Sequence, residues 1–184
     1  HKKYNDLGEC EIYIPCDIEM LSILRKGHYV FRYDDDMFCK IETPEITTDA
    51  EAGDYITATA TDICKILSGR IIWDNFVYTG TVGGFIKKVL IENVINSTQR
   101  FRNIPNFTID ESSLDSITDE ITYTTKSDDI LQLIISTCKT VNCGFRVYYN
   151  ANTQKLVFRL YRGKNKATMQ SNEYVEFSPQ FANI

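Results

Sequence analysis

Apolar and polar positions alternate in short runs between residues 29 and 62. β-branched and aromatic residues fill these runs, and acidic or glycine-containing turns separate them, which is typical of consecutive antiparallel strands. In the last run, Ile56, Ala58 and Ala60 alternate with hydroxyl-bearing residues, so one face of the sheet is small and apolar and the other is mostly polar. Because such a sheet leaves strand edges and an apolar face in water, we expect something to cover it.

Shorter elements flank this meander. The alternation over residues 9–15 predicts a strand, and Asp17 is expected to cap a short helix over residues 18–25 that Gly27 ends in a left-handed conformation. Other expected elements are a break at Pro44 after Ile41, a short helix over residues 63–67 capped by Thr61 or Asp62, and an apolar strand with Ile71, Ile72, Trp73, Phe76, Val77 and Tyr78.

The hydrophobic period changes after Gly80. Apolar residues recur at three and four positions over residues 81–95, which predicts an amphipathic helix capped by Thr81. A second helix is expected after Ser127 as its cap, with a buried stripe of Ile130, Leu131, Ile134, Ile135 and Cys138. The other expected elements are an extended segment at 104–109, an acidic loop at 110–118, a strand at 120–124, a hairpin with its turn at 150–153, and a strand at 174–177.

These patterns predict a β-rich α+β protein. A meander comes first, and two helices with extended segments and a hairpin follow it. The apolar face of the hairpin needs the stripe of the second helix above it, so these elements are expected to form one compact unit.

Composition and charge limit the classes of partner that the chain is expected to bind. The chain has 184 residues, 43% of them hydrophobic, and a formal charge of −5, which argues against sequence-specific nucleic acid binding. No apolar run approaches the roughly 20 residues that a bilayer requires, so no membrane partner is expected. The chain starts at His1 without Met, which suggests a piece of a longer protein. The six cysteines form no C-x-x-C pair, and we interpret them as free thiols packed as small hydrophobic groups.

Two segments invite a ligand hypothesis. The acidic run 34–36 could hold calcium, but it lacks the interleaved spacing of calcium loops, and a hairpin turn with solvated charges explains it better. The glycine-containing segment 80–87 lies between a strand and a helix, as a phosphate loop does. Its spacing is wrong and no Lys-Ser or Lys-Thr follows the last glycine, so the start of a helix is the better interpretation.

No catalytic, cofactor or metal site is predicted. His28 is the only histidine in the body of the chain and follows a turn, and no carboxylate pair stands out among the acidic residues. Two glycosylation sequons, at Asn96 and Asn106, carry no weight without secretion. Aromatic residues that could bind sugar, although packing is the preferred interpretation, are Trp73, Tyr78, Tyr148 and Tyr149.

The order of several segments resembles a known family. These segments are 8–15, 27–36, 54–62, 67–72, the helix that starts at Thr81, and 177–181. Together they resemble siphovirus and prophage tail proteins similar to the baseplate hub proteins at the tip of phage tails. The motifs are turns and strand patterns rather than catalytic signatures.

The resemblance implies a structural protein of the virion tail, assembled in the cytoplasm of the bacterial host. It implies a partial tail-tube-like β-barrel at residues 1–74, an inserted α/β domain of two helices and a β-hairpin at 75–165, and the start of a second β domain at 166–184. Expected partners are further copies of the chain, as a trimer, and other tail and baseplate proteins that link tail tube and tail tip. Two alternatives stay open: a tail-associated cell-wall hydrolase, and a carbohydrate- or receptor-binding module.

Overall fold

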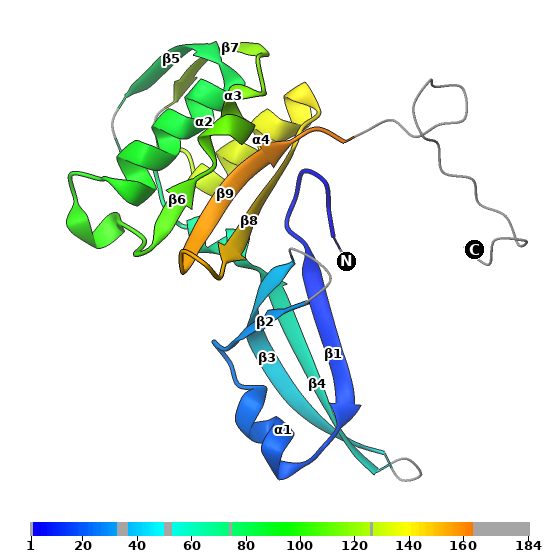
Figure 1. Cartoon of the computed structure of the whole chain (residues 1–184). Coiled ribbons are helices and arrows are strands. Elements are labelled where there is room, and N and C mark those ends of the chain that lie inside the picture. Colours follow the sequence, from blue (N-terminus) through cyan, green and yellow to red (C-terminus); the bar gives the residue numbers. More distant parts are fainter. Residues whose placement is uncertain (1, 33–36, 50–52, 74, 126, 164–184) are drawn as a thin grey trace, which may run out of the picture.

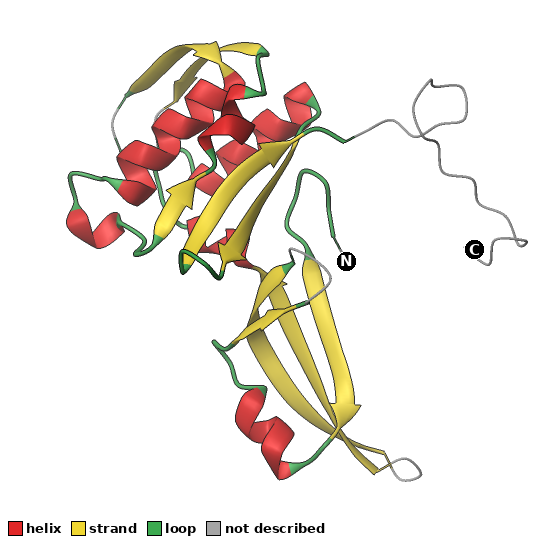
Figure 2. Ribbon diagram, viewed as in Figure 1, coloured by secondary structure: helices red, strands yellow, loops and turns green. Residues whose placement is uncertain are grey.

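The computed structural model describes residues 2–32, 37–49, 53–73, 75–125 and 127–163. Within them the fold is α+β and rich in strands, as the sequence predicts (Figures 1 and 2). A curved sheet forms one part, with strand order β1-β4-β3-β2. Its elements are β1 (Glu9–Pro15), α1 (Ile18–Ile23), β2 (Tyr29–Phe31), β3 (Phe38–Asp49) and β4 (Gly53–Asp62).

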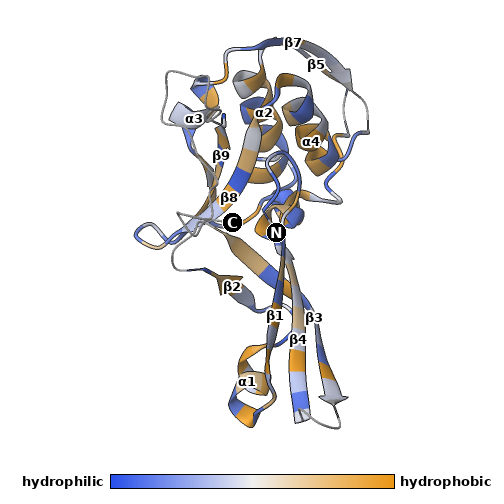
Figure 3. Ribbon diagram, turned by 90° about the vertical axis from the view of Figure 1, so that its right-hand side faces the viewer, coloured by the Kyte–Doolittle hydropathy of each residue, from blue (hydrophilic) through white to orange (hydrophobic). Residues whose placement is uncertain are grey.

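The second part is an α/β lobe in which helices α2 and α4 lie between two smaller sheets (Figures 1 and 3). One sheet pairs β5 with β7, and the other has the order β6-β9-β8. The elements of this lobe are η1 (Ile63–Leu67), β5 (Phe76–Thr81), α2 (Val82–Leu90) with the π-helical turn η2 (Ile91–Ile95), η3 (Arg100–Arg102), β6 (Phe107–Ile109), α3 (Glu111–Asp115), β7 (Glu120–Thr125), α4 (Ile130–Val141), β8 (Gly144–Asn150) and β9 (Lys155–Tyr161).

The register of the curved sheet confirms the predicted two faces. β4 pairs antiparallel with both β1 and β3, and Ile56 faces Ile14 on one side and Ile46 on the other. Ile56, Ala58 and Ala60 are buried, and Leu24 after α1 joins them in one hydrophobic cluster. The period of two in the sequence therefore identifies the covered face correctly.

Pro44 does not break the meander. β3 runs through it without interruption, with a bulge between Ile41 and Thr43, and Pro44 pairs with Ala58. β2 pairs with β3 only from Phe38 to Lys40, so at Pro44 the strand has β4 on one side and no strand of the described chain on the other. A proline is tolerated there because its missing N–H is not needed by a neighbour.

The cap of α4 also differs from the prediction. The Gln132 N–H donates to Asp129 Oδ1 at 3.1 Å, so Asp129 is the N-cap, whereas Ser127 has a φ of 68°. The other oxygen of Asp129 accepts the Gly69 N–H at 2.6 Å. This one carboxylate therefore both starts the helix and fixes the segment that follows η1.

Three further expectations need correction. Residues 110–118 are not a loop throughout, because Asp110 accepts the Ser113 N–H at 3.2 Å and starts α3. Ile71 makes only an isolated bridge with Asp129, and β5 begins at Phe76. α1 ends at Ile23 rather than at residue 25. The strand expected at 174–177 lies outside the described residues.

The described chain has two hydrophobic clusters. The smaller belongs to the curved sheet and α1. The larger unites the buried residues of α2 and α4 with the small sheets, and it includes Ile63, Cys64 and Leu67 of η1. The predicted stripe of α4 lies in it. The connection after β4 is therefore packed against the lobe, and this packing fixes the position of the C-terminal end of β4 relative to the lobe.

Candidate functional site

The curved sheet has two strand edges that no described strand covers. β1 pairs with β4 alone, and β3 beyond Ile41 also pairs with β4 alone. Each edge presents main-chain N–H and C=O groups along one side, which can hydrogen-bond to another strand. This arrangement can extend the sheet on both sides by strand addition.

Apolar side chains gather near these edges. Ile46 on β3 is 57% exposed although it lies on the same face as buried Ile56. Ile18 at the start of α1 is 88% exposed, and Ile23 at its end is also exposed. α1 buries none of its residues fully, and it lies beside the curved sheet at the end distant from the lobe (Figure 1).

The opposite face of the sheet is polar. Glu11 faces Thr59 and Tyr13 faces Thr57 across β1 and β4. The rings of Tyr13 and Tyr55 stack with centroids 4.7 Å apart and planes 6° apart. This face therefore presents hydroxyl and carboxylate groups to its surroundings, while the other is built for burial.

The glycines of residues 80–87 have a packing reason. Thr81 Oγ1 accepts the Gly84 N–H at 3.1 Å and caps α2, as predicted. A Cβ at Gly83 would lie 1.9 Å from the Leu114 carbonyl oxygen, and one at Gly84 would lie 2.3 Å from the Tyr78 hydroxyl. Helix start and close packing thus account for the glycines of this segment.

The other sequence candidates are dispersed. His28 is exposed, and its Nδ1 lies 2.8 Å from the Ile23 carbonyl oxygen. The acidic run 34–36 lies outside the described residues. Among the described residues, no group of three or more His, Cys, Asp or Glu side chains could hold a metal ion, and no described helix has the length and hydropathy of a membrane span.

All six cysteines are free thiols, as interpreted from the sequence. Cys39, Cys64, Cys138 and Cys143 are buried. Burial raises the pKa of Cys39 to about 12 and raises the pKa of Cys64 well above its ordinary value. Cys39 and Cys64 therefore stay protonated at neutral pH and pack as small apolar groups.

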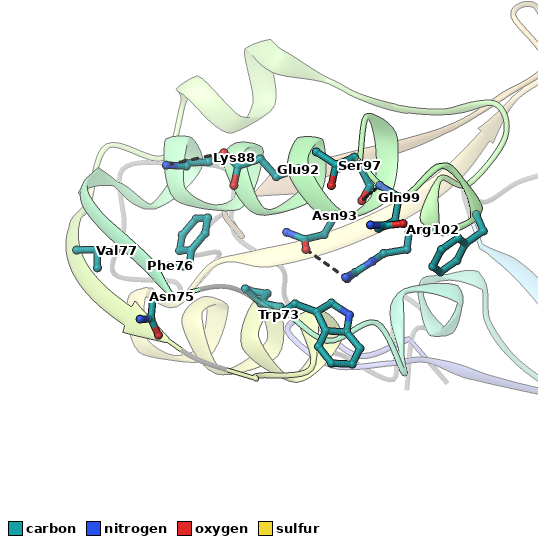
Figure 4. A pocket seen from close by; sticks show the side chains of 13 residues that line it. Trp73, Asn75, Phe76, Val77, Lys88, Glu92, Asn93, Ser97, Gln99 and Arg102 are labelled. Atoms are coloured by element: carbon teal, nitrogen blue, oxygen red, sulfur yellow. Dashed lines mark hydrogen bonds and ion pairs between the residues drawn. The ribbon is translucent and has the colours of Figure 1, made fainter.

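A cavity with a volume of about 960 Å³ lies on the lobe (Figure 4). Trp73 lies on one side, and Lys88, Glu92 and Asn93 of the α2–η2 helix lie opposite. Arg102 reaches between them, donating from Nη2 to Asn93 Oδ1 at 3.2 Å and to the Ile71 carbonyl oxygen at 2.5 Å. The helix and the segment before β5 are thereby joined across the floor of the cavity.

The aromatic candidates divide accordingly. Trp73 lines the cavity. The other three pack against neighbours: the ring centroids of Tyr78 and Phe85 are 5.6 Å apart, and those of Tyr149 and Phe38 are 5.8 Å apart. The Arg159 guanidinium carbon lies 5.0 Å from the centroid of the Tyr148 ring. The sequence reasoning missed Arg70, Phe101 and Arg102. The sequence signal that could have indicated these residues is the run 100–102, in which an aromatic residue stands between two arginines.

Comparison with known proteins gives one family. The family described as "Siphovirus ReqiPepy6 Gp37-like protein" matches residues 1–184. No curated protein matches the chain significantly.

Two solved structures are similar over 84% of this chain and 41% of their own length. One is the prophage tail protein gp18 from Listeria monocytogenes EGD-e, with 16% identity and a TM-score of 0.48. The other is the E. coli c3393 protein, with 13% identity and a TM-score of 0.43; it is described as a component of the type VI secretion system with structural similarity to the T4 tail proteins gp27 and gp5. The chain thus spans about two fifths of the length of these structures.

Proposed function

Because the chain belongs to the Siphovirus ReqiPepy6 Gp37-like protein family, we propose that it is a structural, hub-like component of a phage or prophage tail. In this proposal it links the tail tube to the tail tip as part of the virion and is assembled in the host cytoplasm. It has no catalytic part in the assembly, and its partners are further copies of itself and other tail and baseplate proteins.

The observation that carries the proposal is the curved sheet with two edges that no described strand covers. An exposed strand edge can hydrogen-bond to a strand of another chain. Proteins that stay monomeric protect such edges with charges, bulges or covering elements. The β3 edge carries a bulge between Ile41 and Thr43 and a proline at Pro44, but beyond Pro44 it exposes Ile46. Strands from sister subunits would satisfy the main-chain groups and bury this side chain.

The two unlike faces support a ring in particular. In a closed ring of such sheets, one face must line the inside and the other must face outward. The hydroxyl- and carboxylate-bearing face, with Glu11, Thr57 and Thr59, suits a water-filled passage. We propose a trimer, in which three copies each contribute this sheet and a second β domain that begins within residues 166–184.

The division into residues 1–74, 75–165 and 166–184 is part of the same proposal. Two separate hydrophobic clusters support the first two units. Residues 63–72 pack with the lobe, so they form the connection between the units.

Light scattering on the full-length protein tests the assembly. We expect self-association that rises with concentration, and Ile46→Lys should weaken it because a charge would enter the buried contact. Val77→Lys is the matched control, since Val77 is 61% exposed on β5 of the lobe. A wild-type protein that stays monomeric at all concentrations, or equal effects of both substitutions, would refute the assembly.

A further inference from the structure

A second surface of the protein lies on the lobe and has no part in the proposed ring. The cavity of about 960 Å³ adjoins a smaller one of about 340 Å³, and both are lined by Trp73, Phe101 and Arg102. Trp73 is 74% exposed and Phe101 is 85% exposed. The two cavities therefore form one groove, here called the Trp73 groove, with two aromatic side chains and one arginine at its middle.

The groove carries positive charge that no carboxylate of the described chain neutralises. Arg70 donates to the carbonyl oxygens of Ile66 and Arg102, and Arg102 donates to the Ile71 carbonyl oxygen and to Asn93. All of these acceptors are uncharged. Arg70 Nε lies 3.4 Å from the Arg102 carbonyl oxygen, and burial, and then the neighbouring charge of Arg102, lower the pKa of Arg70.

The polar side chains that line the groove form hydrogen bonds and an ion pair with one another. Asn93 is 8% exposed, donates to the Val89 carbonyl oxygen at 3.0 Å and accepts from Arg102. Lys88 Nζ and Glu92 Oε1 are 3.8 Å apart and form an ion pair along the α2–η2 helix. Ser97 Oγ accepts the Gln99 N–H at 3.3 Å, which shapes the turn into η3. The groove is thus largely preformed.

We propose that the Trp73 groove binds a negatively charged saccharide, one whose sugar carries a carboxylate or a phosphate. The negative face of an indole or phenyl ring attracts the polarised C–H groups of a pyranose ring stacked on it. Arginine offers a planar fork of donors that matches a carboxylate or phosphate. Exposed rings beside two arginines that form no ion pair with a described carboxylate therefore fit a ligand that is both a sugar and an anion.

A hydrophobic segment of another protein fits less well. Such a segment would stack on Trp73 and Phe101 but would bury Arg70 and Arg102 further without supplying an acceptor of opposite charge, which is costly. An anionic sugar removes that cost, because it brings the counter-charge with it.

The test uses the full-length protein on an array of neutral and acidic bacterial saccharides, followed by calorimetry with the best acidic saccharide. We expect acidic saccharides to bind better than neutral ones of the same length, and binding to weaken as salt rises. Trp73→Ala and Arg102→Gln should each weaken binding by about tenfold. Two matched controls should leave it within about twofold: Phe31→Ala removes an exposed ring on β2, and Arg100→Gln removes a charge outside the groove.

The outcomes separate clearly. Trp73 and Phe101 are exposed, so their alanine variants should keep the wild-type unfolding temperature, and Phe101→Ala replaces Arg102→Gln if the latter fails to fold. The proposal is wrong if the array shows no acidic saccharide bound, if neutral saccharides bind equally well, or if the groove variants behave like the controls. None of these results bears on self-association through the curved sheet.

Discussion

Gly83 in the first turn of α2 offers a strong test of how the lobe is packed. An added Cβ there would lie 1.9 Å from the Leu114 carbonyl oxygen and 2.7 Å from its carbonyl carbon. Leu114 belongs to α3 and is fully buried. Because the obstacle is main chain rather than the end of a side chain, Gly83→Ala can be accommodated only if α2 and α3 move apart.

The size of the effect follows from two opposing contributions. Alanine favours a helix over glycine by about 1 kcal/mol. Overpacking costs about 1–3 kcal/mol, and contact with the main chain places this substitution at or above the upper end of that range. We therefore expect a net loss of about 2 kcal/mol, since the clash outweighs the gain in helix propensity. For a chain of this size that lowers the unfolding temperature by about 4–8 °C.

Urea unfolding followed by circular dichroism measures this loss, and Gly84→Ala is the matched control. A Cβ at Gly84 would meet the Tyr78 hydroxyl at 2.3 Å, but that atom ends a half-buried side chain that can rotate away. We expect the control to stay within about 1 kcal/mol of the wild type. If Gly83→Ala is as stable as Gly84→Ala, then α2 and α3 are not in main-chain contact, and packing no longer explains the glycines of residues 80–87.

Three other substitutions or conditions test separate features. Asp129→Ala should lower the free energy of unfolding by about 1–2 kcal/mol in urea titrations, because it removes the cap of α4 and the acceptor for Gly69; an unchanged midpoint would contradict it. Asn142 has a φ of 50° after α4, so Asn142→Ala should cost about 1 kcal/mol while Asn142→Gly should not, and equal midpoints for the two would refute this. The folded-state pKa of Cys39 is raised to about 12 from an ordinary value of 9.0, so stability should fall between pH 9 and 12, where the unfolded chain loses the proton and the folded chain keeps it. The free energy of unfolding of Cys39→Ala should fall less steeply with pH over that range. An identical slope would show that this thiol does not contribute to the pH dependence of stability.

The predictable parts of the fold are those whose burial follows a local period. The alternation of Ile56, Ala58 and Ala60 and the stripe of α4 were read directly from the sequence, because strands and amphipathic helices repeat every two or 3.6 residues. The β8–β9 hairpin was predictable for the same reason, and its register pairs Val147 with Phe158. In each case neighbouring residues alone decide which side chains are covered.

The missed parts depend on contacts between distant segments. Pro44 fits inside β3 because β2 is too short to reach it, and a sequence pattern does not give the length of a partner strand. Asp129 rather than Ser127 caps α4, and its second bond is to Gly69, sixty residues earlier. The Trp73 groove has the same origin: Arg102 is held by Ile71 and Asn93, and each of the three is unremarkable in its own segment.

The separation of the two hydrophobic clusters has a consequence for function. The curved sheet is stabilised by one cluster and the Trp73 groove stands on the other, so each surface can change without unfolding the support of the other. Additivity is expected for substitutions that share no partners. Ile46→Lys should therefore weaken self-association without changing saccharide binding per subunit, and Trp73→Ala should do the reverse. If each variant altered both properties, the ring contact would have to extend from the sheet onto the lobe, and the groove would lie within the assembly interface instead of facing an external ligand.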